Sequence, residues 1–423
     1  MTASPIPERF KRHALQPEEA QRRLLARVGR LPAETVALSQ AWRRRLAEPI
    51  AAPHPFPPFR RSGMDGYALR AEDVRAASAG SPVTLEVLET LPGGTAPTRP
   101  LGPGQASRIM TGGMLPEGAD AVVMLEMTDA MERGGKPFVK INKSVPPGEN
   151  MAGIGSEIRE GELLLEAGRL VGPGEAAVLA ACGYAQVSVF RKPKVAVLST
   201  GSELLEPSEP LAPGKIRNSN APMLEALIRE AGAEPVLLGK VPDDADEAEA
   251  LILRGLEAAD LMVTTGGVSV GDYDILVDIL ARWDGETLFN KIAMRPGSPT
   301  TAAVRGGRLL LALSGNPGAC FVGFHLFALP ALRAMQGVRD PLPFRFPARL
   351  AVPFPKVNAF RRYVRARSEI RPDGTVWVAP TGEDQSSLMT TIVDADCLIE
   401  IPPLKEGYSA GQPVMAVRLG ERS

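Results

Sequence analysis

The sequence predicts a multidomain protein in which one α/β domain, built on a central doubly wound parallel sheet, is joined to two smaller β-rich parts. The length of 423 residues exceeds what one ordinary hydrophobic core supports. Between Pro193 and Gly337, strand-like and helix-like segments alternate, which is typical of a parallel sheet covered by helices. Elsewhere, short apolar runs separated by turn residues favour β structure.

The region before the α/β domain is predicted to contain two parts. A helix over 18–28 is followed by Pro49–Phe59, whose five prolines cannot continue a helix. Short β-like runs, such as 83–88 and 121–127, then extend to about Val145. We therefore predict a discontinuous N-terminal α/β linker domain at 1–53 and 146–190, with a helix over 173–181, and a β-rich insertion domain at 54–145.

The α/β domain is assigned to 191–337 and the C-terminal β domain to 338–423. Strands are predicted at 194–200, 235–241, 261–265 and 308–313, and helices at 222–231, 244–258, 273–283 and 318–336. Short strands at 375–378 and 397–401, with no long helix, predict a compact β domain at the C-terminus. Ligands of open parallel sheets bind beyond the carboxyl ends of the strands, where two glycine-rich loops, 264–274 and 314–318, fall.

Bulk composition excludes several classes of function. The balance of 48 basic and 49 acidic residues provides no general field for nucleic acid or an anionic membrane. The longest apolar stretch, 319–335, contains His325 and Pro330 and is shorter than the roughly 20 residues of a membrane span. The N-terminus lacks the apolar core of a signal peptide, so we expect a cytoplasmic protein.

The few cysteines and histidines exclude two further kinds of site. The three cysteines are far apart, which indicates buried apolar side chains in a reducing compartment rather than disulfides. The three histidines have no zinc-ligand spacing, and no Gly-x-Ser-x-Gly elbow is present. A structural zinc site and a serine hydrolase are therefore both disfavoured, and His325 is predicted to pack in the core.

The segment Thr264–Asp274 is the strongest candidate for a ligand site. An apolar strand leads into Gly266, Gly267 and Gly271, and glycines let backbone N–H groups approach a phosphate closely. An ordinary strand-to-helix connection is the alternative interpretation.

Carboxylates follow three of the predicted strands. Glu203 follows the first strand, Asp243 and Asp244 the second, and Asp274 the third, so they can meet at one edge of the sheet. Such a group suits Mg²⁺ held by a few carboxylates together with substrate phosphate. For Asp243 and Asp244, capping of the next helix is an equally good explanation.

Two cations, Lys291 and Arg295, are spaced so that both can face the same edge of the sheet. Opposite a phosphate or another oxyanion they would neutralise negative charge, and arginine can donate two hydrogen bonds at once. Ordinary solvated ion pairs remain an alternative.

With these residues in view, the chain resembles the MoeA family of molybdopterin molybdenumtransferases, which includes the E domain of gephyrin. The likeness covers nearly the full length. The segments that carry it are Ser62–Ala68 (SGMDGYA), Ile109–Gly112 (IMTG), Ser199–Leu204 (STGSEL), Thr265–Gly271 (TGGVSVG) and Gly315–Pro317 (GNP). It implies a MogA/MoaB-like central domain and a small C-terminal β-barrel.

The resemblance also implies a reaction and a set of site residues. Adenylylated molybdopterin and molybdate would react with Mg²⁺ present to yield molybdenum cofactor and AMP. The resemblance assigns catalytic roles to Asp65, Glu203, Asp274, Lys291 and Arg295; metal ligation to Glu203, Asp243 and Asp274; and pterin, phosphate or molybdate binding to Thr111, Gly266, Gly267, Ser269, Gly271, Gly315, Asn316, Pro317, Arg362 and Ser386.

Family likeness further implies a homodimer whose cleft takes Asp65 from the partner subunit, and a possible molybdopterin adenylyltransferase partner. The chain departs from the family pattern at Ser298, where a lysine is common, and at Ala319, where a serine is common. Further departures are the segment 151–155, where arginines are frequent, and Glu157, where an aspartate is usual. A weakly catalytic molybdopterin-binding or scaffolding protein is therefore a second hypothesis, and a nucleotide pyrophosphatase or amidase a third.

Overall fold

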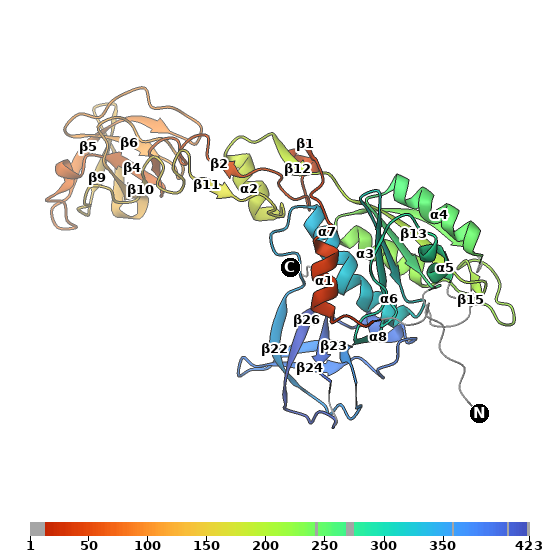
Figure 1. The fold of residues 1–423 in the computed structure, drawn as a ribbon. Helices are drawn as coiled ribbons and strands as arrows, with labels where there is room; N and C mark the ends of the chain where they lie inside the picture. Colours follow the sequence, from red (N-terminus) through yellow and green to blue (C-terminus); the bar gives the residue numbers. More distant parts are fainter. Residues whose placement is uncertain (1–12, 242–243, 268–274, 358, 404–405, 421–423) are drawn as a thin grey trace, which may run out of the picture. The chain divides into compact units, whose positions relative to one another are not determined.

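A computed structural model of the chain describes residues 13–241, 244–267, 275–357, 359–403 and 406–420 (Figure 1). Contacts divide it into two compact units. Unit 1 comprises Met1–Glu48, Ala167–Gly172 and Gln186–Ser423, and unit 2 comprises Pro49–Glu166 and Pro173–Ala185. The finer division into four domains stays a prediction.

Unit 1 is built around a six-stranded sheet, which confirms the α/β prediction. Its order is β16-β13-β17-β21-β20-β18, and the first four strands are parallel. The two outer strands are antiparallel and were not predicted. The signal for β20 was present, because Gly306-Gly307 between the apolar runs of β20 and β21 is typical of a tight hairpin. The strands are β13 (Lys194–Thr200), β16 (Glu234–Val241), β17 (Leu261–Thr265), β18 (Glu286–Phe289), β20 (Thr301–Arg305) and β21 (Arg308–Leu313).

Helices cover both faces of this sheet because its strands are apolar on both sides. Val197, Val263 and Leu311 are in register and belong to one core, which includes α1 (Pro17–Leu25) and α3 (Asn220–Glu230). Their sequence neighbours pack on the opposite face, against α4 (Ala245–Ala258) and α5 (Ile275–Ala281). This alternation of two buried faces explains why the strands read as continuous apolar runs.

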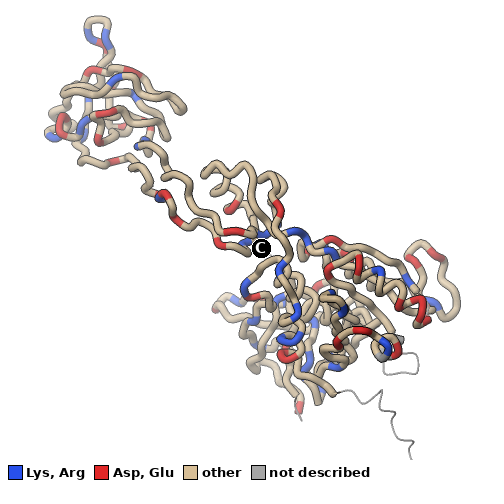
Figure 2. Tube along the Cα trace, turned by 45° about the horizontal axis from the view of Figure 1, so that its top comes forward, with Lys and Arg blue, Asp and Glu red and all other residues tan. Residues whose placement is uncertain are grey.

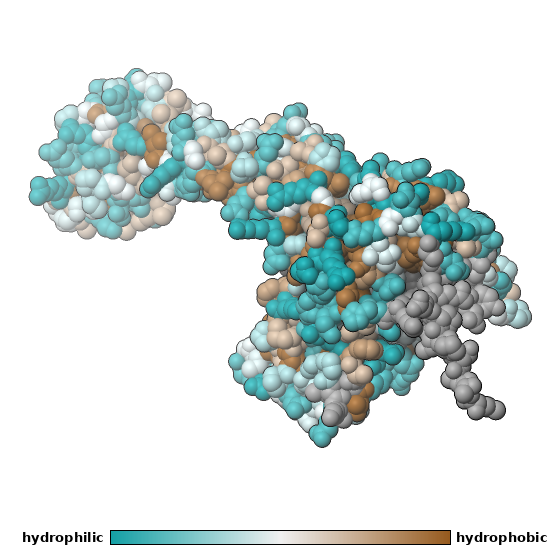
Figure 3. All heavy atoms as spheres, in the orientation of Figure 1, coloured by the Kyte–Doolittle hydropathy of each residue, from teal (hydrophilic) through white to brown (hydrophobic). Residues whose placement is uncertain are grey.

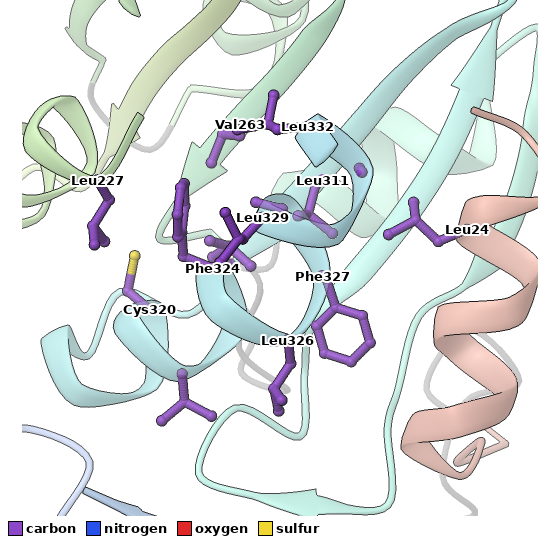
Figure 4. Close-up of a cluster of buried hydrophobic side chains, with 14 of the residues drawn as sticks. Leu24, Leu227, Val263, Leu311, Cys320, Phe324, Leu326, Phe327, Leu329 and Leu332 are labelled. Atoms are coloured by element: carbon purple, nitrogen blue, oxygen red, sulfur yellow. The ribbon is translucent and has the colours of Figure 1, made fainter. Parts of the chain in front are cut away.

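The predicted helix over 318–336 exists, but a wider turn interrupts it. The segment Pro317–Met335 consists of α6 (Pro317–Gly323), the π-helical turn η5 (Phe324–Ala328) and α7 (Leu329–Met335). Pro330 follows that turn and removes one regular helical hydrogen bond. The segment is long and apolar enough to cross a membrane, yet 89% of its most apolar window is buried within this chain. Figure 4 shows its Phe324, Leu329 and Leu332 among side chains of the sheet and of α1.

The C-terminal part of unit 1 is a closed β-barrel, as predicted. Strand β23 pairs with β24, the order continues through β22, β26 and β25, and β25 pairs again with β23. The short strand β19 (Met294–Arg295) also pairs with β23, which joins the barrel to the α/β part. The barrel strands are β22 (Arg345–Leu350), β23 (Arg361–Ile370), β24 (Val376–Pro380), β25 (Cys397–Ile401) and β26 (Pro413–Arg418), with α8 (Thr390–Val393) between β24 and β25.

Unit 2 contains a second six-stranded sheet, with the order β7-β4-β6-β5-β9-β8. Apolar side chains of β4 pack on both of its faces, since Leu69 and Ala68 belong to different cores. The strands are β4 (Gly66–Leu69), β5 (Val83–Leu91), β6 (Gln105–Ile109), β7 (Ala121–Met124), β8 (Thr128–Arg133) and β9 (Lys136–Ile141), and α2 (Pro173–Ala181) also belongs to unit 2. In unit 1, β1 (Ala33–Ala37) pairs with β12 (Gln186–Phe190), which begins where the chain returns from unit 2.

The surface matches the balanced composition. Figure 2 shows basic and acidic residues interspersed along the described chain. Apolar side chains on the face in Figure 3 are scattered among hydrophilic ones. All three cysteines are buried and unpaired, and His325 is buried in the core, as predicted.

Candidate functional site

A cleft of about 1040 Å³ lies within unit 1 where the sheet meets the barrel. Three of its walls are the loops that follow β13, β17 and β21, which are the carboxyl ends of parallel strands. The loop after β19, the barrel segment 384–389 and Arg362 also line the cleft. The cleft thus lies where an open α/β sheet is expected to bind a ligand.

Glycines allow the cleft floor to pack closely. Gly266 and Gly267 have φ values of +92° and +62°, a region that glycine enters without steric cost. A Cβ at Gly266 would clash with the carbonyl oxygen of Thr200, and one at Gly315 would lie 3.4 Å from Gly266 Cα. The backbone of two loops therefore meets with no side chain between them. Three further predicted residues of the first loop, Ser269, Gly271 and Asp274, lie outside the described residues.

One buried side chain, Asn220, connects three walls of the cleft. Its Nδ2 donates to Thr265 Oγ1 at 2.7 Å and to the Gly315 carbonyl at 2.8 Å. The Thr265 hydroxyl donates in turn to the carbonyl of Ser314 at 3.2 Å. The loops after β13, β17 and β21 therefore share one hydrogen-bonded network. Asn220 was not among the predicted site residues, although its position at the start of a helix after a sheet strand was a usable signal.

The Glu203 carboxylate lies at the cleft and folds back over the backbone of Gly201. A Cβ at Gly201 would lie 2.6 Å from Glu203 Oε2, so glycine leaves room for this conformation. The side chain is exposed, so its carboxylate can bind a cation or accept a hydrogen bond from a ligand hydroxyl or N–H group. The other predicted metal ligands, Asp243 and Asp274, lie outside the described residues, and within the described ranges no three Asp, Glu, His or Cys residues are grouped as a metal site.

The neighbouring Asp244 has a structural role. Its Oδ1 accepts from the backbone N–H groups of Asp246 and Glu247, at 3.0 and 2.9 Å. It is therefore the N-cap of α4, which supports the capping alternative for this residue.

The barrel contributes polar groups to the cleft, including both residues predicted there. Arg362 donates to Asp384 Oδ2 at 2.7 Å from Nε, and the ion pair lines the cleft. Ser386 Oγ accepts from Asn316 Nδ2 at 3.3 Å. The fold thereby brings together four predicted residues, namely Arg362, Ser386, Asn316 and Pro317.

The predicted pair of cations is split. Arg295 is exposed and lines the cleft, whereas Lys291 is not among the lining residues. Ser298 lines the cleft, but its hydroxyl donates to the Ile292 carbonyl at 2.8 Å. The cleft is also lined by residues that were not predicted from the sequence, including Lys215, Arg217, Asn218, Asn220, Asp384 and Ser387.

Asp65 and Thr111 lie in unit 2 and bind each other. Asp65 Oδ1 accepts from the Thr111 backbone N–H at 2.6 Å and from its hydroxyl at 2.7 Å. These two bonds lower the pKa of the exposed Asp65 carboxyl, the backbone bond most. Asp65 is thus held as an anion in a fixed orientation.

Comparison with known proteins identifies the family. Three family profiles match consecutive parts of the chain: the MoeA N-terminal region (domain I and II) over 15–183, a probable molybdopterin binding domain over 196–334, and the MoeA C-terminal region (domain IV) over 347–419. A molybdopterin molybdenumtransferase of Bacillus subtilis is 44% identical over 413 residues, covering 98% of this chain and 96% of the relative. The chain belongs to the MoeA family.

Other MoeA-family relatives agree along almost the whole length. A molybdopterin molybdenumtransferase of Staphylococcus aureus is 40% identical over 404 residues, covering 96% of this chain and 95% of the relative. The crystal structure of a molybdopterin biosynthesis MoeA protein from Pyrococcus horikoshii OT3 has 30% identity and a TM-score of 0.81, and covers 96% of this chain and all of that one. The MoeA assignment thus holds for both sequence and fold.

Proposed function

We propose that this protein is a molybdopterin molybdenumtransferase, which inserts molybdate into adenylylated molybdopterin and releases molybdenum cofactor and AMP. The observation that carries the proposal is the cleft itself. It combines a bare glycine floor, the carboxylate of Glu203 and a barrel wall with Arg362 and Ser386. Relatives at 40 and 44% identity over nearly the full length are named for this activity.

The residues of this chain fit distinct parts of such a substrate. The Gly266 N–H donates to the Leu313 carbonyl at 3.2 Å and fixes the turn, so the backbone donor we assign to a phosphate oxygen is the N–H of Gly267, which also lines the cleft. Arg362, Ser386 and Arg295 offer hydrogen-bond donors to a tetrahedral oxyanion. Holding molybdate against the sulfurs of the pterin would convert an encounter between two substrates into a reaction within one complex.

Mg²⁺ is the cofactor we propose. Glu203 is an exposed carboxylate at the cleft, and Mg²⁺ commonly binds one or two carboxylates together with substrate phosphate and water. Bound there, with Asp243 and Asp274 as further proposed ligands, the ion would neutralise charge on the phosphate linkage to AMP.

The decisive experiment measures AMP release. Purified protein, Mg²⁺ and adenylylated molybdopterin are mixed with and without molybdate, and AMP is quantified. We expect release that depends on both molybdate and Mg²⁺. Glu203→Ala and Asp274→Ala should each lower the rate at least about 100-fold, because a metal ligand contributes strongly to charge stabilisation.

A matched control is Glu257→Ala, which removes an exposed carboxylate at the end of α4, away from the cleft lining. This variant should keep the wild-type rate. Normal turnover by Glu203→Ala and Asp274→Ala would refute their assigned roles, and molybdate-independent hydrolysis of simple nucleotide diphosphates would favour a pyrophosphatase.

One observation favours weak catalysis with tight pterin binding. The Ser298 hydroxyl is engaged by a backbone carbonyl, and Ala319 has no hydroxyl, so two lining positions offer the oxyanion no side-chain donor. Under this alternative, molybdopterin binds but AMP release shows no molybdate dependence.

We further propose a cytoplasmic homodimer that receives its substrate from a molybdopterin adenylyltransferase.

A further inference from the structure

A buried arginine, Arg365, lies behind the barrel wall of the cleft. It is only 2% exposed and lies on β23, three residues after Arg362. Its Nε donates to Thr391 Oγ1 at 2.7 Å and its Nη2 to the Gln385 carbonyl at 2.8 Å. Its Nη1 is buried and has no hydrogen-bond partner among the described residues. The guanidinium thus retains unused donor capacity.

The unused nitrogen faces the start of the helix that borders the cleft. A Cβ at Gly318 would lie 2.9 Å from Arg365 Nη1, so a side chain there would displace the guanidinium. The Gly318 N–H donates to the Ser386 carbonyl at 2.9 Å. Pro317, Ala319 and Ser386 line the cleft, whereas Gly318 and Arg365 do not. Arg365 therefore lies one layer behind the surface that would receive the oxyanion.

The charge of Arg365 is not balanced by a contacting acid. Asp384 is paired with Arg362, and no carboxylate among the described residues lies within 4.0 Å of Arg365. Burial lowers the pKa of the Arg365 guanidinium, whereas the negative charge of Asp384, which is farther away, raises it. A buried cation without a partner is unfavourable for folding and becomes more favourable when an anion binds nearby.

We propose that Arg365 is a positioning residue for the oxyanion substrate: it holds the Gln385–Ser387 segment in place and adds positive potential behind the Arg362–Ser386 wall. This inference rests on the proposed function. The charge of Arg362 is largely neutralised by Asp384. The unbalanced charge of Arg365 behind the wall therefore attracts the oxyanion more than the paired charge of Arg362 does. The preferred ligand is a doubly charged tetrahedral oxyanion such as molybdate.

The test measures oxyanion binding separately from turnover. Molybdate is titrated against wild type, Arg365→Lys and Arg365→Gln, with the shift in melting temperature as the readout, and AMP release is measured in parallel. We expect Arg365→Gln to raise the half-saturating molybdate concentration at least tenfold, while the rate at saturating molybdate changes less. Arg365→Lys keeps the charge and should remain within about threefold of wild type.

Arg367→Gln is the matched control, because Arg367 is an exposed arginine on the same strand. It should bind molybdate as wild type does. The melting temperature of each variant without molybdate is measured as well, to show that the variant is folded. Equal binding by wild type and Arg365→Gln overturns this inference alone. Equal loss in Arg365→Lys and Arg365→Gln overturns the charge role. Failure of wild type to bind molybdate at all overturns the proposed function as well.

Discussion

Individual side chains determine the shape of the cleft as well as its chemistry. Asn220 joins three loops that are up to 95 residues apart in the chain, through hydrogen bonds to Thr265 and the Gly315 carbonyl. Gly266 and Gly315 then permit the same loops to approach without side chains between them. The bonding groups of this network are shielded from water, so each lost bond leaves an unpaired buried polar group.

Asn220→Ala is expected to weaken both folding and catalysis. Loss of the two bonds should lower the free energy of unfolding by about 1–3 kcal/mol and reduce AMP release by roughly tenfold. Urea unfolding and the AMP assay measure the two effects. Thr265→Val removes the shared hydroxyl, so the double variant should be less damaged than the sum of both; strict additivity would contradict a shared network.

The buried His325 makes stability depend on pH. Its ring nitrogens have no hydrogen-bond partners among the described residues, and burial lowers its pKa to about 3. Below about pH 6.5 the unfolded chain binds a proton that the folded chain does not. The free energy of unfolding should therefore fall as pH drops from about 6.5 toward 3, by up to about 1.4 kcal/mol per pH unit from this group.

The comparison is with His325→Gln, which cannot titrate. Urea unfolding of both proteins between pH 7 and pH 5 should show a shallower loss of stability in the variant. Parallel curves would mean that His325 is protonated in the folded protein as well, contrary to the low pKa.

Helices and strands could be predicted from the sequence where a few neighbouring residues determine them. Strands β13, β17, β21 and β25 begin and end at the predicted residues, because continuous apolar runs bounded by turn residues leave little choice. The strands β18 and β20 were not predicted, although the Gly306-Gly307 turn before β21 marked the hairpin of β20. The π-helical turn within Pro317–Met335 escaped because one apolar pattern spans it.

At the level of one element, Asp244 tests the distinction between a cap and a metal ligand. Asp244→Ala removes two hydrogen bonds at the start of α4 and should cost about 1 kcal/mol of stability. AMP release and its dependence on Mg²⁺ concentration should stay as in wild type. A raised Mg²⁺ requirement in this variant would assign Asp244 to the metal site instead.

At the scale of the whole molecule, the proposed homodimer makes a prediction about which subunit supplies Asp65. Asp65→Ala and Glu203→Ala should each be inactive. If Asp65 serves the cleft of the partner subunit, mixed dimers of the two variants contain one intact cleft, and mixing after subunit exchange should restore about a quarter of the wild-type activity. No recovery, with subunit exchange verified by tagged chains, would contradict a shared site.

Local patterns alone determined the α/β core, the β character of both flanking parts, the glycine loop and the positions of several cleft residues. These depend on apolar periodicity and turn chemistry, which act over a few residues. Motif order along the chain also pointed to the MoeA family, which the comparisons confirm.

Only the tertiary structure decided which distant side chains meet. It paired Arg362 with Asp384, joined Asn220 to the loops of β17 and β21, placed Arg365 behind Gly318, and separated Lys291 from the lining of the cleft. The physical reason is that hydrogen bonds and burial depend on distances in space. Those distances are set by how the strands and the barrel pack, which no local pattern in the chain encodes by itself.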